Sequence, residues 1–452
     1  MPYIPHTDED IEEMLSQIGV ESIEELFSSI PEKIRQTHEP ALPESLSEQD
    51  VIRAVTGLAE RNLDCSRLLC FLGGGTYHHY IPPAVPHLLS RSEFYTSYTP
   101  YQAEFSQGTL QAMFEFQTMV CELFGMEVAN ASMYDGAQAA AEATLMALRI
   151  RPKNKTGKIL VASSLNPLYK RTVETYLARL DRDVEEVEFY PSGRLDLDRL
   201  RKDASDAVAI MVQHPNYFGV LERMDEIGEI CKESEPVLIT VTSEPLAMGM
   251  LEPPGSFGAD IVAAEGQSLG IPMGFGGPHL GLFACRWEDK RKMPGRLAGM
   301  TTDRDGRQGF VLTLATREQH IRRGKATSNI CTNQGLMALA AAIYMSLTGP
   351  EGLEEIARTN RANCEYLKQR LEEEGAGKLA FASPTFNEFV LDLSQDPGPV
   401  IEKMLEKGHL AGIPLKEKFP ELDTHLLITA TEMLCKDDLD RFARDLKMSL
   451  AE

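Results

Sequence analysis

The sequence predicts an α/β protein built on a large, mostly parallel sheet and followed by a smaller α/β unit. Between residues 158 and 285, short runs rich in β-branched residues alternate with helical patterns, as in strands joined by right-handed crossovers. These runs are apolar at nearly every position, which is typical of strands covered by helices on both faces. The 452 residues exceed one ordinary domain. We expect a helical segment over residues 1–62, a large domain over 63–345 and a small C-terminal domain over 346–452.

The N-terminal segment carries signals for the start of a helix. Thr7 precedes three acids and an apolar pattern, so we expect it to cap a helix whose first turn is acidic. Ser22 and Ser47 begin similar patterns, and we expect the same kind of cap there. The segment shows no catalytic motif.

The two later domains are predicted to alternate between helices and strands. In the large domain we expect helices over residues 108–124, 137–149, 168–180, 224–234 and 332–347. We expect its strands over residues 158–163, 184–190, 207–214, 236–241 and 280–285, with a further strand ending near Val262. In the small domain we expect helices over residues 353–374, 397–407 and 436–449 and strands over residues 386–393 and 426–430. Gly349-Pro350 should end the helix that precedes the small domain.

The composition excludes several classes of function. The chain has 45 basic and 68 acidic residues and a net charge of −23, which disfavours binding to nucleic acids or to anionic membranes. No run approaches the roughly 20 apolar residues of a membrane-spanning helix, and the acidic N-terminus resembles no signal or transit peptide. The eight cysteines form no C-x-x-C pair. We therefore expect reduced cysteines, no metal site and a cytoplasmic location.

The first candidate motif is Gly73-Gly74-Gly75-Thr76-Tyr77-His78-His79-Tyr80. Its glycines allow a close approach to a ligand or to another chain. The pattern is neither a Walker loop nor a dinucleotide-binding fingerprint, and adjacent histidines on an extended chain point to opposite faces. Two interpretations remain open, a ligand loop and a tight loop with polar contacts to its neighbours.

The second candidate motif is rich in aromatic and hydroxyl side chains. Residues 94–102 read Phe-Tyr-Thr-Ser-Tyr-Thr-Pro-Tyr-Gln. Such side chains offer stacking surface and hydrogen bonds to a cofactor ring, a phosphate or another subunit. The alternative is an irregular loop with its tyrosines packed on the core.

Two further segments lie next to predicted elements. Asp135 precedes an Ala-rich helix whose free N–H groups would otherwise suit an anion, but its own carboxylate would occupy those donors. Residues 266–278 form a Gly-rich loop after a strand, which is a common context for a ligand loop. No lysine occurs between Asp260 and Arg286.

The segment 317–325 concentrates positive charge in an acidic chain. It contains Arg317, Arg322, Arg323 and Lys325. Two interpretations remain open. The segment binds a carboxylate, a phosphate or an acidic partner surface, or it pairs with the chain's own excess of acids.

Four blocks of the sequence together resemble a known family. The blocks are FLGGGTYHHYIPP, EFYTSYTPYQAEFSQGTLQAMFEFQT, EGQSLGIPMGFGGPHLG and REQHIRRGKATSNICTNQ. They resemble the α-subunit type of the glycine cleavage system P-protein, and the resemblance extends over essentially the whole chain. It implies the aspartate-aminotransferase-like fold type I of enzymes that depend on pyridoxal phosphate (PLP), with a large domain and a small C-terminal domain.

The resemblance also implies where a catalytic member of this fold holds its cofactor. A lysine just before a Gly-rich loop holds PLP as a Schiff base, and an Asp after an earlier strand pairs with the pyridine nitrogen. Here the lysine position falls on Gln267 or, with a register shift of one residue, on Ser268. The strand expected to supply the Asp reads Thr240-Val241-Thr242-Ser243-Glu244. Neither an amide nor a hydroxyl replaces the lysine amine, so we expect no cofactor covalently bound to this chain.

The resemblance further implies a heteromeric glycine-decarboxylating enzyme, assembled as (αβ)₂. The β subunit would hold PLP. The assembly would decarboxylate glycine and pass the aminomethyl group to the lipoyl arm of H-protein with release of CO₂, and this chain alone would be inactive. Active sites of this fold form at subunit contacts, so this chain would contribute walls to the site of the β subunit. We expect these walls from His78, Tyr95, Thr96, Ser97, Tyr98, Tyr101 and Gln102.

Two alternatives to this interpretation remain. The first is a purely structural subunit that stabilises the β subunit and docks H-protein. The second is a self-sufficient PLP enzyme that uses another lysine, such as Lys325. A nicotinamide-dependent dehydrogenase is a poor interpretation, because no G-x-G-x-x-G pattern follows the first strand.

Overall fold

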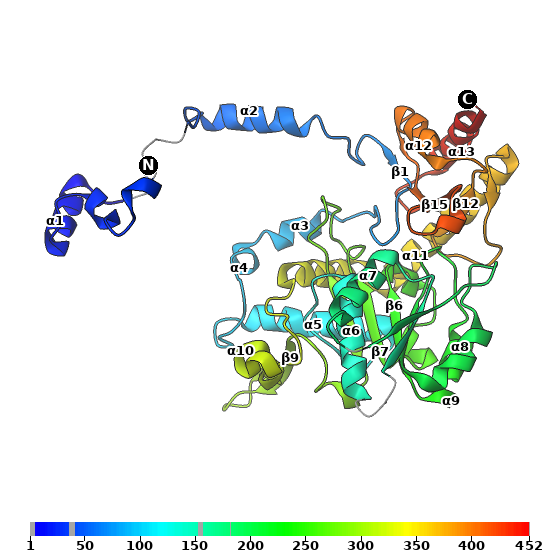
Figure 1. Cartoon of the computed structure of the whole chain (residues 1–452), viewed down its shortest axis with the longest axis horizontal. Coiled ribbons are helices and arrows are strands. Elements are labelled where there is room, and N and C mark those ends of the chain that lie inside the picture. Colours follow the sequence, from blue (N-terminus) through cyan, green and yellow to red (C-terminus); the bar gives the residue numbers. More distant parts are fainter. Residues whose placement is uncertain (1–4, 36–40, 152–156, 181, 452) are drawn as a thin grey trace. The chain divides into compact units, whose positions relative to one another are not determined.

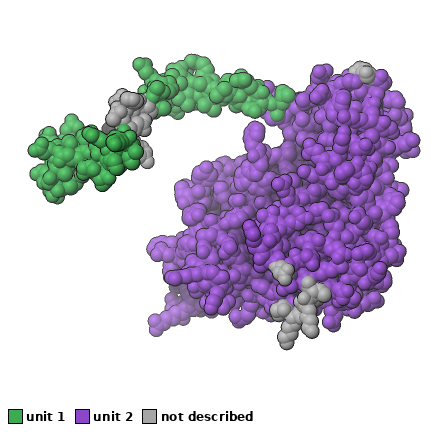
Figure 2. Space-filling model, in the orientation of Figure 1, with its two compact units in different colours: residues 1–63 green, residues 64–452 purple. Residues whose placement is uncertain are grey.

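The structure, a computed structural model, describes residues 5–35, 41–151, 157–180 and 182–451. It forms two compact units, residues 1–63 and 64–452, which Figure 2 shows in different colours. The smaller unit contains α1 (Asp8–Ile18), the 3-10 turns η1 (Ile23–Phe27) and η2 (Glu32–Ile34), and α2 (Glu48–Ala59).

Two of the three predicted helix caps in the smaller unit are confirmed. The Thr7 hydroxyl accepts the Asp10 N–H at 3.2 Å, and the Ser47 hydroxyl accepts the Asp50 N–H at 3.3 Å. Ser22 instead precedes η1 and makes no side-chain cap. The predicted cap at Ser22 is therefore wrong.

A seven-stranded sheet forms the centre of the larger unit (Figure 1). Its strands, in order across the sheet, are β2 (Val128–Ala129), β8 (Gly281–Cys285), β7 (Ile261–Glu265), β6 (Val237–Thr242), β5 (Ala207–Gln213), β3 (Lys158–Ala162) and β4 (Val184–Val187). β8 runs antiparallel to β7 and β2, and the pairs from β4 through β3, β5 and β6 to β7 are parallel. The prediction of a mostly parallel sheet is confirmed.

Helices cover both faces of this sheet because its buried strands send alternate side chains in opposite directions. The helices of this layer are α5 (Gln107–Phe124), α6 (Gly136–Ile150), α7 (Pro167–Leu177), α8 (Leu197–Asp203), α9 (Met224–Ser234) and α11 (Gly335–Glu374). α6 and α7 pack on the face that carries Met211 and Ile239. α8 and α9 pack on the opposite face, beside Ile210 and Leu238. α5 and α11 pack beside Val262 of β7.

Helix α11 connects the two parts of the larger unit. Gly349, with φ 60° and ψ −177°, interrupts the helical backbone before Pro350, so the two helices predicted on either side are present and joined by a kink. Among the described helices, α11 alone is long and apolar enough to cross a membrane by length and composition. Its residues Ala341 and Tyr344 are buried in the core against α5 and β7.

A second, antiparallel sheet carries the C-terminal part. Its strands, in order, are β11 (Lys378–Leu379), β12 (Glu388–Asp392), β15 (His425–Thr429) and β14 (Ile413–Pro414). α12 (Pro397–Glu406), α13 (Lys436–Ala451) and the second half of α11 pack on it around Phe389, Leu426 and Phe442. β1 (Leu69–Cys70) pairs with β13 (His409–Leu410), and this pairing positions the Gly-rich segment that follows β1.

The end of β7 and one hairpin are among the parts of the larger unit that differ from the sequence prediction. β7 runs to Glu265, beyond the predicted end near Val262, because the Glu265 side chain is buried and accepts backbone N–H groups instead of facing solvent. A hairpin of β9 (Leu297–Thr302) and β10 (Gln308–Thr313) is absent from the prediction. Its residues are mostly exposed or half-buried, so they show no continuous apolar run. The short helices α3 (Ala84–Leu89) and α4 (Ser92–Tyr95) precede α5.

Candidate functional site

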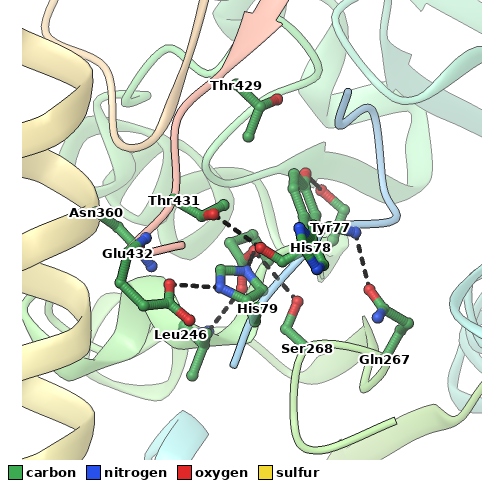
Figure 3. A network of polar contacts seen from close by, with 12 residues as sticks. Tyr77, His78, His79, Leu246, Gln267, Ser268, Asn360, Thr429, Thr431 and Glu432 are labelled. Carbon is green, nitrogen blue, oxygen red and sulfur yellow. Dashed lines mark hydrogen bonds and ion pairs between the residues drawn. The ribbon is translucent and has the colours of Figure 1, made fainter. Parts of the chain in front are cut away.

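The candidate site lies at the ends of β6 and β7. Open α/β sheets bind ligands outside the carboxyl ends of their parallel strands. Glu244 lies shortly after β6, and Gln267 and Ser268 lie shortly after β7. The segment 73–80, which follows β1, and Glu432, which follows β15, reach the same place (Figure 3).

His79 joins the end of β6 to the C-terminal sheet. Its Nε2 lies 2.8 Å from Glu244 Oε2, and its Nδ1 lies 2.8 Å from Glu432 Oε2. Burial by itself lowers the pKa of His79, but the two carboxylates outweigh burial and raise this pKa to about 10. For the acid Glu432, burial acts in the opposite direction and raises the pKa. The hydrogen bond and ion pair with His79 more than offset burial, so the pKa of Glu432 is lowered. The His79 ring is therefore a cation between two carboxylates at neutral pH.

Glu388 of β12 is a second buried acid of this network. Its Oε1 accepts the Gly74 N–H at 2.7 Å and the Thr429 hydroxyl at 3.0 Å, and its Oε2 accepts the Tyr77 hydroxyl at 2.7 Å. Burial raises its pKa to about 7, although these three donors favour the charged form. Hydrogen bonds from the segment 73–80 and from Thr429 thus satisfy this carboxyl group without a cation.

Close contact with the C-terminal sheet explains the glycines of the first motif. A Cβ atom on Gly73 would lie 2.0 Å from Thr429 Oγ1 and 2.2 Å from Glu388 Oε1. Gly74 has φ +69°, a conformation that other residues rarely adopt. Asn166 Nδ2 also donates to the Gly74 carbonyl at 2.9 Å. The structure favours the second interpretation of this motif, a tight loop with polar contacts to its neighbours.

Gln267 and Ser268 stand at the predicted lysine position, and both are buried. Gln267 Oε1 accepts the Tyr77 N–H at 2.8 Å, and its Nε2 donates to the Ile271 carbonyl at 2.8 Å. The Ser268 hydroxyl donates to Glu244 Oε2 at 3.2 Å. Both ends of the Gln267 amide therefore hold backbone segments together, and neither side chain carries an amine.

The N-terminus of α6 is occupied by acids of the chain itself. Asp135 Oδ1 accepts the Gln138 N–H at 2.7 Å, and Glu265 Oε2 accepts the Gly136 N–H at 2.9 Å. These carboxylates use the first-turn donors that a phosphate would need and repel a second anion. The prediction that Asp135 occupies these donors is confirmed, and Glu265 contributes a second carboxylate.

A groove of about 460 Å³ opens beside this network. It is lined by Asp64, Cys65, Tyr77, His78, His79, Tyr80, Ile81, Gln267, Ile271, Pro272, Met273, Gly274, Phe275 and Met433. None of these described residues is a lysine or an arginine. The acid at the end of β6 is already paired with His79, and acids occupy the N-terminus of α6. These residues do not fit PLP held by a covalent bond.

The aromatic loop, residues 94–102, is not part of the lining of this groove. Tyr95, Tyr98 and Tyr101 are 67%, 82% and 59% exposed, and Gln102 is exposed as well. The alternative of tyrosines packed on the core is therefore wrong for these three residues. His78 is half-buried and lines the groove beside the His79 network.

Phe94, Ser97 and Tyr98 of the aromatic loop (residues 94–102) line a second, smaller pocket. Ser97 and Tyr98 face Thr332 there, and the pocket has a volume of about 190 Å³. The Tyr98 hydroxyl lies 3.3 Å from the Thr332 hydroxyl. The Thr96 hydroxyl donates to the Ser92 carbonyl at 2.6 Å. Thr96 is therefore engaged within its own turn, whereas Ser97 and Tyr98 line the pocket.

The basic segment does not pair with the chain's own acids through its four strong cations. Arg317 is buried and donates to three backbone carbonyls. Arg322, Arg323 and Lys325 are exposed and form no ion pair within the described ranges. The interpretation of these cations as partners of internal carboxylates is wrong for the described part of the chain.

Sequence reasoning missed two acids of the network. Glu388 and Glu432 lie 311 and 353 residues along the chain from Tyr77 and His79, their partners. Glu388 lies in the predicted strand 386–393 together with Asn387 and Asp392, so the strand pattern does not single it out. Glu432 follows its strand in a polar turn and leaves no signal either.

Several known proteins are similar to this chain. The family model of the glycine cleavage system P-protein matches residues 1–446. A relative from Geobacillus kaustophilus, named probable glycine dehydrogenase (decarboxylating) subunit 1, is 48% identical over 445 residues, 98% of this chain and 98% of that protein. A crystal structure of glycine decarboxylase (P-protein) in an inhibitor-bound form has 41% identity and a TM-score of 0.90, covering 99% of this chain and 100% of that chain.

The fold is that of PLP-dependent enzymes of fold type I. Glutamate decarboxylase from Lactobacillus brevis shares it with a TM-score of 0.70 at 13% identity, over 94% of this chain and 97% of that chain. The fold expected from the sequence is therefore confirmed.

Removing the buried cation predicts a large loss of stability. His79→Gln leaves Glu244 and Glu432 buried without a positive partner, so we expect the free energy of unfolding at pH 7 to fall by about 3–5 kcal/mol. His78→Gln, at the half-buried neighbour, should change it by less than about 1 kcal/mol. Urea unfolding of the two variants measures the difference, and equal losses would contradict the role of His79.

The same ion pairs predict a pH dependence of stability. The folded pKa of His79, about 10, lies above the ordinary value of 6.5. Its stabilisation is therefore fully present below pH 6.5 and is lost as the pH rises through about 10. Between these limits the Tm of the native chain should fall more steeply than that of His79→Gln in matched calorimetric scans. Parallel slopes would show that the ring is neutral in the folded protein.

Proposed function

Because the chain belongs to the glycine cleavage system P-protein family, we propose that it is the PLP-free subunit of a two-subunit glycine decarboxylase. Membership of the family supports an enzymatic role in glycine decarboxylation. The assignment to a subunit that acts with a second one follows the name of its relative, subunit 1. We place the complex in the cytoplasm.

In the proposed reaction, an (αβ)₂ assembly removes CO₂ from glycine and passes the aminomethyl group to the lipoyl disulfide of H-protein. The electron pair left by CO₂ forms the new carbon–sulfur bond, the disulfide bond breaks, and the second sulfur takes up a proton. PLP on the second subunit supplies the electron sink. The enzyme corresponds to glycine dehydrogenase (aminomethyl-transferring, decarboxylating), and this chain alone is inactive in the proposal.

The proposal rests on the identity and the hydrogen bonds of Gln267. Its amide stands just after β7, where a catalytic member of the fold needs an amine, and both of its polar atoms are hydrogen-bonded to backbone. The acid after β6, Glu244, is paired with His79. These contacts support a chain whose own strand-end pocket serves its structure, while the cofactor is bound by the second subunit.

The aromatic loop supports a role at the contact with the second subunit. The loop exposes the aromatic side chains of Tyr95, Tyr98 and Tyr101 to solvent, which is typical of residues that act across an interface. We assign the wall of the β-subunit site to Tyr95, Thr96, Ser97, Tyr98, Tyr101, Gln102 and His78.

Two other functions make different demands on the residues of this chain. A purely structural subunit would not need the tyrosine hydroxyls. A self-sufficient PLP enzyme would need a lysine near the strand ends, and Lys325 lies instead on the exposed turn η8 (Arg323–Lys325), outside the lining of the groove.

Borohydride reduction in the presence of PLP tests the location of the cofactor. The chain alone and the chain purified with its second subunit are each reduced, digested and analysed by mass spectrometry. We expect a stoichiometric pyridoxyl-lysine peptide from the second subunit and none from this chain, because Gln267 provides no amine. A stoichiometric adduct on Lys325, or on any other lysine of this chain, would contradict the proposal.

Loss of one tyrosine hydroxyl tests the shared site. Tyr98→Phe should lower kcat of the assembled enzyme about tenfold, the effect of losing one hydrogen bond of about 1.4 kcal/mol, and should leave assembly intact. Tyr176→Phe, on α7 at 38% exposure, is the matched control and should retain full activity. Light scattering reports assembly and glycine-dependent CO₂ release reports kcat. Unchanged kinetics for both Tyr98→Phe and Tyr95→Phe would favour the purely structural subunit.

A further inference from the structure

A compact basic turn interrupts the acidic surface of the chain. We define the basic face as His320, Ile321, Arg322, Arg323 and Lys325, on α10 (Gln319–Arg322) and η8. All five residues are exposed. The chain has a net charge of −23, yet the three strong cations of this face pair with no acid in the part of the chain that the structure describes. Such a cluster creates a local positive potential.

The backbone of this turn is held in a strained conformation. Arg323 has φ 53° and ψ −127°, which a residue with a Cβ atom rarely adopts. Such strain persists only where neighbouring contacts enforce it. The Ala326 N–H donates to the Arg323 carbonyl at 3.0 Å, and the Thr327 N–H donates to the Arg317 carbonyl at 3.0 Å. The turn is closed on itself and presents its cations to solvent.

Two buried arginines, Arg317 and Arg296, make contacts next to the basic face, and Arg296 also contacts the aromatic loop. Arg317, 6% exposed, is bonded to three backbone carbonyls. Arg296, 3% exposed, donates from Nη2 to the Tyr101 hydroxyl at 3.1 Å, and its Nε lies 3.5 Å from Glu318 Oε2. The rings of Tyr101 and His320 meet edge to face, with centroids 6.2 Å apart. The exposed Tyr101 therefore adjoins the basic face.

We propose that the basic face docks an acidic patch on the lipoyl-bearing carrier protein. This inference rests on the proposed function, because the carrier must bring its lipoyl arm to the subunit contact that Tyr101 is proposed to line. Three exposed cations that pair with no acid of the described residues favour a partner surface of opposite charge. Exposed Arg and Tyr side chains are also enriched at protein interfaces.

A transient carrier fits the composition of this face better than a permanent subunit does. Permanent interfaces are larger and more apolar, with lysine depleted at their centres. The basic face offers one apolar side chain, Ile321, among solvated charges. Charges of this kind act mainly on the rate of association and on its salt dependence. Because the chain as a whole repels an acidic protein, a local positive cluster beside the aromatic loop would orient the approaching carrier.

Charge reversal in the assembled two-subunit enzyme tests this docking. Calorimetric titration with lipoylated carrier protein, without glycine, measures binding independently of turnover. The variant R322E/R323E/K325E should raise the Kd about tenfold or more at low ionic strength and flatten its salt dependence. Its KM for the carrier should rise in parallel. Activity with free lipoic acid as the acceptor should stay unchanged, because that small molecule needs no docking surface.

A matched control separates the basic face from total charge. R179E/K416E/K418E makes the same change in net charge at three exposed cations that form no ion pair within the described ranges, and it should retain native affinity. Unchanged carrier affinity in the basic-face variant, or an equal loss in the control, would overturn the inference. Loss of subunit assembly in the basic-face variant alone would also overturn it, because the face would then belong to the permanent interface. Salt-dependent binding of carrier by a native complex that does not decarboxylate glycine would support the docking and refute the proposed function.

Discussion

The buried cation of His79 is the contact on which the strand-end pocket depends. It stands between Glu244, after a strand of the parallel sheet, and Glu432, after a strand of the C-terminal sheet. Removing one partner of a buried ion pair leaves an uncompensated charge, so none of the three side chains can change alone. Ser268 donates to the same Glu244 oxygen. One balance of charge therefore holds the large sheet, the C-terminal sheet and the Gly-rich segment in fixed relation.

The same network occupies the pocket at the strand ends with the chain's own polar groups. In the described pocket, protein groups meet the demands that a cofactor would otherwise meet: an amide of Gln267 bridges two backbone segments, and Asp135 and Glu265 use the donors of α6. The three strong cations of the basic face lie on an exposed turn and form no ion pair within the described ranges. Arg296 donates to Tyr101, so the aromatic loop adjoins the basic face, as the two proposed contacts with other proteins require.

Much of the fold follows from local patterns. Helix α9 has the predicted bounds, and the apolar runs of β3, β5 and β6 lie within a residue or two of the predicted ends, because buried parallel strands must be apolar on both faces. The hairpin of β9 and β10 was beyond prediction since its residues are largely exposed. At the site, the absence of an amine at Gln267 and the cap at Asp135 could be foreseen. The pairing of His79 with Glu432 could not be foreseen. These two residues are 353 positions apart in the sequence, and only folding brings them together.

The sequence by itself determined the family, the fold class, the missing lysine and the excess of negative charge, because each is a property of residue types in order along the chain. Tertiary structure alone decided which charges are neutralised. The acids at positions 244, 388 and 432 are ordinary carboxylates in the sequence; packing buries them, gives Glu244 and Glu432 a shared cation, and gives Glu388 three donors. The cations at 322, 323 and 325 receive no such partners from the described chain. Charge pairing depends on distance and burial, and neither can be read from position in the sequence.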